Sequence, residues 1–400
     1  MKKSISLIML MALFISLLLI FSCSEWGAPD YAEPKDGPIP VITRVEPPDS
    51  AGGGVNIITV VGQNFASTLD SNTIYFDSYI AEKVDGNDSS VTVRRPNLVS
   101  DSATVKVLIP NALIVAKYYP YKITSVYSVV GNFLEARPIR GIAIDADENL
   151  YVLQYIPNVN PVFKVTPTGD KTDAGKTIKA VTDAKIAPSG LLICLANDTM
   201  ITQVDPATQT ESIWAYVDEF VAGSKRSKKV QYGDFDQNGY FYAGGNKSGI
   251  YVLAPGDSIA HPSGLYGTDK VLCLRVYQNS IYILLSTGIY RTGFDQNGQL
   301  TNEKVEVLKW SNMGDYASST ANWFDFSSDG KIFVATDNVN PIMVYNPADG
   351  SQDVYYKSIL PTPATKIAWG TGNYLYLAVG SQEIMLKINM GIAGAPYWGR

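Results

Sequence analysis

Short apolar runs separated by polar turns fill the chain from about residue 124 to residue 400. In the clearest copy, residues 141–152, two apolar runs flank an acidic, asparagine-containing turn, a pattern typical of a β-hairpin. Five more hairpins follow at intervals of 40 to 51 residues, with turns at Gly190, Gly239, Asn279, Gly330 and Asn373. A second, Pro-containing turn follows several of them, so each period holds four short strands. Such periods predict the blades of a six-bladed β-propeller.

A propeller has to close its ring, because an open ring leaves an unpaired sheet edge. The last blade, residues 366–388, supplies three strands, and the Gly- and Pro-bearing tail 391–400 is not strand-like. We therefore predict the missing fourth strand at residues 125–130, ahead of the first hairpin. The two ends of the propeller would then pair within one blade.

Residues 41–123 alternate apolar and polar positions at period two, which without a helical stretch predicts a small β-sandwich. This segment resembles the immunoglobulin-like IPT/TIG domain, on the strength of residues 40–48, 52–54 ahead of 58–65, 72–76 and 91–96. In that family the domain is a spacer or docking module without catalytic residues. The predicted fold class is thus all-β: an N-terminal Ig-like (IPT/TIG) β-sandwich followed by a six-bladed β-propeller over residues 124–400.

The propeller portion resembles NHL-type and gluconolactonase-like six-bladed propellers, in which a G-I-A-x-D-x-x-x-N-x-Y-V unit recurs. Gly141 to Val152 carries that unit, and later blades depart from it. The resemblance to gluconolactonases implies a divalent metal in the central channel, held by Glu, Asn and Asp of separate blades. That ligand set does not match this chain residue by residue. The whole arrangement is similar to IPT/TIG-plus-NHL lipoproteins of Bacteroidetes-like bacteria, some of which belong to polysaccharide-uptake systems.

The first 22 residues have the pattern of a targeting segment, with Lys2 and Lys3 ahead of an apolar run over residues 5–21. The run ends at Cys23 and resembles a bacterial lipobox, which implies cleavage and acylation of Cys23. Residues 23–40, rich in Pro, Gly and acidic side chains, are predicted to be a flexible tether. The expected location is the cell envelope, as an outer membrane lipoprotein held by its lipid anchor. An ordinary secretory signal and an uncleaved anchor helix are the alternatives.

Charge and cysteine content narrow the classes of partner. The formal net charge of −6 becomes −8 when Lys2 and Lys3 leave with the signal peptide. An acidic protein without a basic stripe is not expected to bind nucleic acid. Cys194 and Cys273 lie in apolar strands of non-adjacent blades, so we predict two buried thiols and no disulfide.

The sequence offers little basis for a metal or a cofactor. Residues 234–239 have the D-x-D-x-N-G start of a calcium loop, but the twelfth position, where a bidentate Glu belongs, is Gly245. Residues 294–298 repeat the same letters in the next blade, so we interpret both segments as hairpin turns. His261 is the only histidine, which disfavours a His metal cluster. No cofactor is predicted.

The loops around the channel mouth form the candidate binding face. They hold Arg137, Arg140, Tyr155, Asn158, Asn160, Lys229, Gln231, Lys270, Asn322, Trp323, Asp337, Asn338, Asn340 and Lys366. From these we predict a ligand site made by Arg140, Tyr155, Asn158, Asn160, Trp323, Asn338, Asn340 and Lys366. Aromatic rings beside amides and cations suit a sugar. The alternative for Trp323, and for Trp369, is packing between blades.

Three functions remain open at this point. The first is a non-catalytic binding module of the envelope, for a glycan or a protein partner. The second is a metal-dependent, gluconolactonase-like hydrolase, and the third is an assembly scaffold. Fold-level resemblance does not choose among them.

Overall fold

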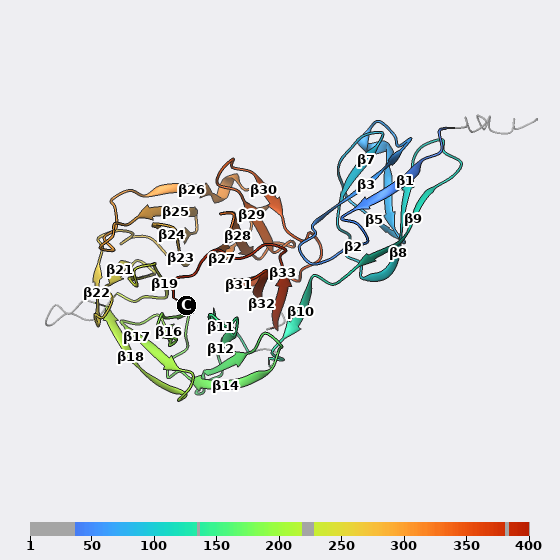
Figure 1. Ribbon diagram of the computed structural model, residues 1–400. Coiled ribbons are helices and arrows are strands. Elements are labelled where there is room, and N and C mark those ends of the chain that lie inside the picture. Colours follow the sequence, from blue (N-terminus) through green and yellow to red (C-terminus); the bar gives the residue numbers. More distant parts are fainter. Residues whose placement is uncertain (1–36, 134–136, 218–227, 381–383, 400) are drawn as a thin grey trace, which may run out of the picture.

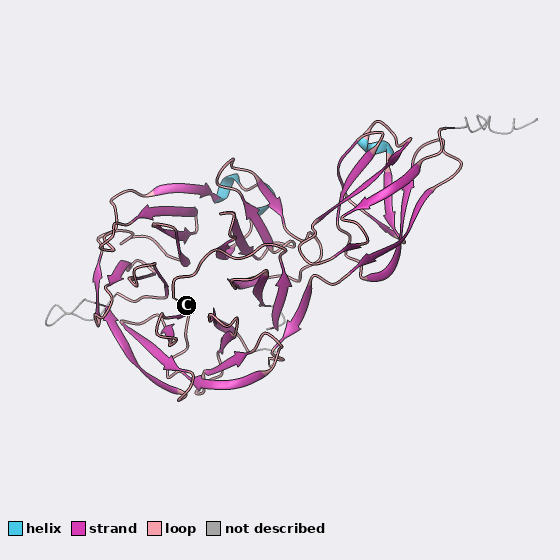
Figure 2. Ribbon diagram, viewed as in Figure 1, coloured by secondary structure: helices cyan, strands magenta, loops and turns pink. Residues whose placement is uncertain are grey.

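The computed structural model describes residues 37–133, 137–217, 228–380 and 384–399 and consists of a sandwich beside a wheel (Figure 1). Strands form nearly all of its regular structure (Figure 2). The helical turns are η1 (Leu69–Ser71), η2 (Trp310–Asn312) and η3 (Gly314–Tyr316). Within these residues no helix has the length and apolar character needed to cross a membrane. Cys23 and the apolar run 5–21 lie outside the described residues.

Two sheets make up the N-terminal sandwich. The first contains β1 (Val41–Glu46), β3 (Ile57–Gln63), β7 (Ser90–Arg94) and β6 (Lys83–Gly86), in that order. The second contains β2 (Ser50–Ala51), β9 (Ala116–Ile123), β8 (Ser100–Leu108), β4 (Thr73–Phe76) and β5 (Tyr79–Ile80). Alternate residues of β3 and β7 face inward and pack against Phe76 and Tyr121 of the other sheet. The predicted period-two alternation is therefore the inner face of a sandwich.

Six four-stranded blades form the wheel, each a meander from the axis outward. Blade 1 contains β11 (Ile139–Ile144), β12 (Leu150–Gln154), β13 (Pro161–Val165) and β14 (Lys171–Lys176). Blade 2 contains β15 (Asp183–Ile186), β16 (Leu192–Leu195), β17 (Met200–Asp205) and β18 (Thr210–Val217). Blade 3 contains β19 (Tyr232–Phe235), β20 (Phe241–Gly245), β21 (Gly249–Leu253) and β22 (Ile259–Pro262). Blade 4 contains β23 (Cys273–Tyr277), β24 (Ser280–Leu285), β25 (Gly288–Gly293) and β26 (Val305–Lys309).

The last two blades complete the ring. Blade 5 contains β27 (Ala321–Phe326), β28 (Ile332–Thr336), β29 (Ile342–Tyr345) and β30 (Gln352–Val354). Blade 6 contains β31 (Ala364–Trp369), β32 (Tyr374–Val379), β33 (Ile384–Asn389) and, as its outer strand, β10 (Tyr127–Val130). Tyr127 pairs with Ile388 and Val130 with Met385 in an antiparallel ladder. The prediction that residues 125–130 close the ring is confirmed.

Burial explains why the second strand of each blade reads as a continuous apolar run. Every residue of β12, β16, β20 and β28 is buried, because neighbouring blades cover both faces of that strand. The two thiols, Cys194 on β16 and Cys273 on β23, are buried and free, as predicted.

Side-chain capping organises the hairpin turns. Oδ1 of Asp236 accepts hydrogen bonds from the backbone amides of Asn238 (2.8 Å) and Tyr240 (2.9 Å). Asp145 and Asp295 accept the same pair of bonds in their own turns. The interpretation of the calcium-loop-like segments as turns is confirmed.

The sandwich contacts the wheel at blades 5 and 6 (Figure 1). Tyr356 is fully buried between them; its hydroxyl accepts from the Gly54 amide and donates to the Asn389 carbonyl, both at 2.5 Å. Arg94 of the sandwich forms a 2.7 Å ion pair with Asp353 of blade 5. A buried tyrosine and an ion pair therefore fix the angle between the two domains.

Candidate functional site

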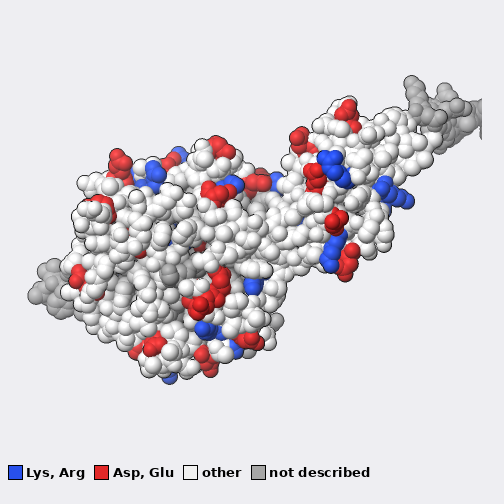
Figure 3. All heavy atoms as spheres, viewed as in Figure 1, with Lys and Arg blue, Asp and Glu red and all other residues white. Residues whose placement is uncertain are grey.

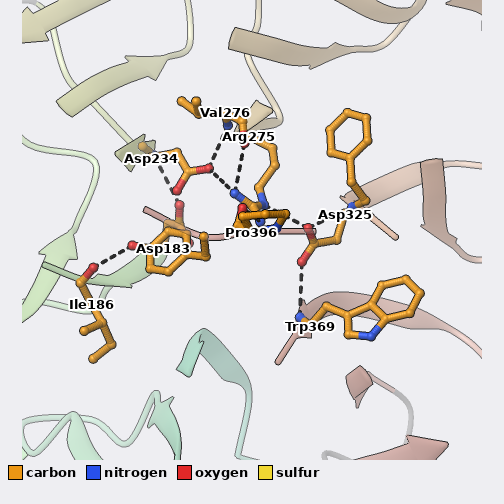
Figure 4. Close-up of polar contacts among 11 residues, drawn as sticks. Asp183, Ile186, Asp234, Arg275, Val276, Asp325, Trp369 and Pro396 are labelled. Atoms are coloured by element: carbon orange, nitrogen blue, oxygen red, sulfur yellow. Dashed lines mark hydrogen bonds and ion pairs between the residues drawn. The ribbon is translucent and has the colours of Figure 1, made fainter. Parts of the chain in front are cut away.

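The innermost strands of the six blades line the central axis, and a charged cluster fills one level of it (Figure 4). The Arg275 guanidinium of β23 donates to Asp234 (2.9 Å) and Asp325 (2.8 Å). The two carboxylates also accept backbone amides, from Val276 (2.7 Å) and Trp369 (3.1 Å). All three charged side chains are at most 8% exposed. Burial lowers the pKa of Arg275, but the two carboxylates outweigh it and raise that pKa.

The C-terminal tail, residues 391–399, closes one end of this channel (Figures 1 and 4). The Tyr397 hydroxyl donates to the Ile186 carbonyl (2.6 Å), and the Tyr397 ring lies 5.4 Å from the Arg275 guanidinium. A cavity of about 30 Å³ remains beside these groups. That volume holds water and excludes a sugar ring. The prediction that the tail is not a strand is correct, but its place on the axis was not foreseen.

The axial donors do not fit a divalent metal. Asp234 and Asp325 are already bound to Arg275, and Asp183, a third buried carboxylate of the inner strands, accepts the Gly233 amide (3.2 Å). Across the described parts of the chain, no three His, Cys, Asp or Glu side chains come together in a way that could hold an ion. The cation at the centre of the wheel is the chain's own guanidinium.

The opposite end of the channel opens into a pocket of about 460 Å³. Lys366 of β31 lies at its base, with its ammonium 3.6 Å from the centroid of the Trp323 ring. The ammonium also donates to the Thr182 carbonyl (2.8 Å). Burial lowers the pKa of Lys366 to about 8, and the positive charge of Arg140 acts in the same direction. Lys366 is therefore charged at neutral pH but loses its proton unusually easily.

Three β-bulges surround this pocket, on the inner strands of the neighbouring blades 5, 6 and 1. The ladder skips one residue on each strand: Arg140 on β11, Asn322 on β27 and Thr365 on β31. All three skipped residues line the pocket. The matching strand pairs of blades 2, 3 and 4 run without a shift. Bulges commonly re-aim a side chain beside a functional site, so this asymmetry marks one sector of the mouth.

The structure brings part of the predicted site together. Arg140, Trp323 and Lys366 line the pocket, and the Tyr155 ring lies 6.0 Å from the Arg140 guanidinium. Trp323 is only 4% exposed and packs edge-on against Tyr232, at 5.7 Å between ring centroids. The Trp323 ring therefore packs against the Lys366 ammonium and is not exposed for stacking with a ligand. Trp369 is 3% exposed and packs against Phe333, which is the inter-blade alternative.

The repeated Asn-Val-Asn-Pro loops join the second and third strands of blades 1 and 5, as predicted, but they do not line the pocket. Asn158 is exposed, in the left-handed region at φ 66°. Asn160 is buried and donates to the Thr177 carbonyl (3.3 Å). Asn338 donates to the Ser319 hydroxyl (2.9 Å), while Asn340 accepts from the Ser358 amide (2.8 Å). The last three asparagines thus tie their loops to the segments that enter or leave the same blade.

Of the wider face, Asn322 alone joins the residues of the pocket wall. Its amide donates to the Ala364 carbonyl (2.8 Å) and so links blade 5 to blade 6. Sequence reasoning missed Thr182, Tyr232 and Thr365, which also line the pocket. The apolar pattern of one strand does not predict a bulge, so the sequence gave no reason to select Thr365. Tyr232, an aromatic residue at the start of an inner strand, could have been included.

Comparison with known proteins supports this architecture. Residues 40–124 match the IPT/TIG domain family. A Bacteroides thetaiotaomicron protein of unknown function aligns at a TM-score of 0.52 and 10% identity, over 89% of this chain and 99% of that one. An auxiliary nutrient binding protein from the same species aligns at 0.50 and 11%, over 91% and 99%. A gluconolactonase from Xanthomonas campestris aligns at 0.51 and 12%, over 72% and 91%.

No curated protein matches the chain by sequence. At 10 to 12% identity, the structural likenesses show the fold alone. The chain is an IPT/TIG immunoglobulin-like sandwich followed by a six-bladed β-propeller.

Proposed function

We propose that this protein is a non-catalytic binding module of the cell envelope, held by a lipid on Cys23, and that its mouth pocket binds a glycan. The observation that carries the proposal is the set of three bulges that point Arg140, Asn322 and Thr365 into one pocket. A bulge interrupts a ladder and is retained where it re-aims a side chain for use. Three at one mouth indicate a built site.

The chemistry of the pocket suits a sugar. The hydroxyls of Thr182 and Thr365 and the amide of Asn322 already donate to backbone carbonyls, so their oxygens are the groups that can accept from sugar hydroxyls. The half-buried Tyr232 adds an aromatic surface. A pocket of about 460 Å³ is in the range of small-ligand sites and admits one or two sugar rings. The auxiliary nutrient binding protein of similar fold is consistent with such a role.

The metal-dependent hydrolase has less support, because its catalysis would need an axial ion. Here Asp234 and Asp325 are committed to Arg275, and the tail closes that end of the channel. Within the described part of the chain, the pocket wall contains no histidine or carboxylate that could serve as a general base.

Blocking the pocket tests the binding proposal without reference to the ligand's charge. The full chain, purified in detergent, is screened on a glycan array, and each hit is titrated by calorimetry. Thr365→Trp fills the pocket and should abolish binding of the hit. Val339→Trp adds the same bulk on the same face at a side chain that is 73% exposed and outside the pocket, and should bind normally.

Asn322→Ala is a second, smaller change for the case in which Thr365→Trp does not fold; it should weaken binding severalfold. Normal binding by a folded Thr365→Trp protein, or the absence of any glycan hit, would refute the proposed site.

The lipid anchor needs its own experiment. Cys23→Ser should remove acylation and release the protein from membranes, because both lipid groups depend on that residue. Retention of the variant in the membrane pellet after a carbonate wash would show an uncleaved helix in place of the lipid.

A further inference from the structure

We propose that the ligand of the mouth pocket is an acidic glycan, and that Arg140 and Lys366 bind the carboxylate of a uronic acid unit. This inference rests on the proposed function and adds the charge of the ligand. Three observations support it: the residues that line the pocket, the lack of an ion-pair partner for Arg140 and Lys366 among the described residues, and the position of both cations at the same pocket.

Among the residues that the structure describes, the wall contains two cations and no acid. Arg140 and Lys366 line the pocket, together with uncharged residues such as Thr182, Asn322 and Tyr232. The protein as a whole carries a net charge of −6, and Figure 3 shows acidic side chains spread over both domains on the drawn face. A purely cationic pocket is therefore a local exception on an acidic protein, and it favours an anion.

Arg140 has no ion-pair partner among the described residues. It is exposed, and its recorded contact is the Tyr155 ring, 6.0 Å from the guanidinium. The contrast with Arg275, which two carboxylates neutralise on the same axis, is direct. A planar guanidinium that presents free N–H groups to a pocket matches the two oxygens of a carboxylate.

Lys366 is the second cation and lies deeper. Its ammonium has one hydrogen bond, to the Thr182 carbonyl, and stacks on Trp323. Asp183 attracts it from below, but that carboxylate accepts the Gly233 amide (3.2 Å) and does not line the pocket. The ammonium therefore keeps N–H donors for a ligand oxygen.

The two cations also repel each other, since the Arg140 charge lowers the pKa of Lys366. An anion between them removes that repulsion and gains two charge-assisted hydrogen bonds. The Thr182 and Thr365 hydroxyls and the Asn322 amide already donate to backbone carbonyls, so they present acceptor oxygens, which do not favour a bare anion but suit the hydroxyls of a sugar ring. The combination indicates a sugar that bears a carboxylate.

The test compares each acidic glycan with its own neutral form. Oligosaccharides of galacturonate, glucuronate and mannuronate are titrated into the full chain beside their carboxyl-reduced counterparts, at pH 7 and low salt. At least one uronate series should bind about tenfold or more tighter than its reduced form. Equal affinity for every pair would overturn the charge assignment.

Arg140→Gln should bring the affinity for the acidic form down to that of the reduced form, without a change in melting temperature, because the side chain is exposed. Arg44→Gln is the matched control: it removes the same charge from an exposed site in the sandwich and should behave as wild type. An unchanged affinity in Arg140→Gln, or a loss in Arg44→Gln as large, would also overturn the proposal.

The outcomes separate the two proposals. If neutral glycans alone bind, and Thr365→Trp blocks them, the proposed function stands and the acidic ligand is wrong. If no glycan binds, both fail. Binding of poly-glutamate as tight as that of the uronates would show recognition of charge without the sugar and would overturn the inference as well.

Discussion

Two ends of one channel use the same kinds of side chain for opposite purposes. At the tail end, Arg275 is held between Asp234 and Asp325, and Tyr397 covers it. At the mouth, no carboxylate of the described residues stands on the pocket wall beside Arg140 and Lys366. The charged residues of both levels belong to the innermost strands of the blades. A buried charged residue is therefore not by itself evidence of a binding site in this protein. The charged residues that have no ion-pair partner are the ones that indicate a site.

The charged cluster at the tail end of the channel has a structural role. Its three charges come from three blades, so each bond joins strands that are distant in sequence. A buried pair is costly to break, because the remaining charge stays in a medium that solvates it poorly. At the open end, Arg140 is exposed and Lys366 is buried at the base of the pocket, and neither forms an ion pair with a described residue.

The largest effect should follow from removal of the central cation. Arg275→Met leaves Asp234 and Asp325 buried without a counter-charge, which should cost about 3–5 kcal/mol of unfolding free energy. Denaturant titration followed by fluorescence measures it. The triple variant Arg275→Met, Asp234→Asn, Asp325→Asn should recover much of that loss, since the amide oxygens can still accept the backbone amides. If Arg275→Met were as stable as wild type, the cluster of Arg275, Asp234 and Asp325 would not stabilise the fold.

The tail should contribute the next largest amount. A Cβ on Gly394 would lie 2.5 Å from the Gly370 carbonyl oxygen and 2.7 Å from the Trp369 ring. Gly394→Ala should therefore destabilise by about 1–3 kcal/mol and expose the tail to proteases. Gly372→Ala is the control, because a Cβ there meets no atom within 4 Å. Equal protease resistance of the two variants would mean that the tail does not seal the channel.

Ligand affinity at the mouth pocket should depend on pH. The pKa of Lys366 is lowered to about 8, so it loses its charge as the pH rises through that value. Affinity for a uronate oligosaccharide should fall about fivefold to tenfold between pH 6.5 and 9.5. Lys185, Asp183 and Cys273 also act on Lys366, and burial raises the pKa of Cys273 to about 12, outside this window.

Lys366→Met should flatten this profile, and a calorimetric titration at each pH measures it. The stability of the empty protein should change in the other direction. Because folding lowers the pKa of Lys366, the unfolded chain binds more protons between about pH 8 and 10.5, and this group's cost to stability declines there. A profile as steep in Lys366→Met as in wild type would assign the pH dependence to another group.

The smallest effects should come from the repeated loops. Asn338→Ala loses hydrogen bonds to Ser319 (2.9 Å) and to the Asn340 amide (3.0 Å), at a cost of about 1–2 kcal/mol. Asn158→Gly should be neutral within about 0.5 kcal/mol, because glycine readily adopts a φ of 66°. Neither should alter glycan affinity, measured by the same titration. A weaker affinity in Asn158→Gly would extend the site beyond the pocket.

The loops also show where sequence reasoning succeeds and where it stops. It found that Asn158 to Pro161 and Asn338 to Pro341 are the same connection in two blades. It could not show that Asn160, Asn338 and Asn340 hydrogen-bond to other connections of their blades, because those partners lie 17 to 19 residues away. Exposed amides and structural amides look alike in a sequence.

The local pattern of this chain determined the all-β class, the sandwich, the six blades and the strand that closes the ring, because strand alternation and turn chemistry are properties of neighbouring residues. Tertiary structure alone decided which charges are paired and which are free. Arg140, Arg275 and Lys366 each sit in a similar inner strand, and their different fates depend on bulges, on a tail that returns to the axis and on carboxylates 41 and 50 residues away. These contacts between distant residues form only when the six blades have closed into a ring.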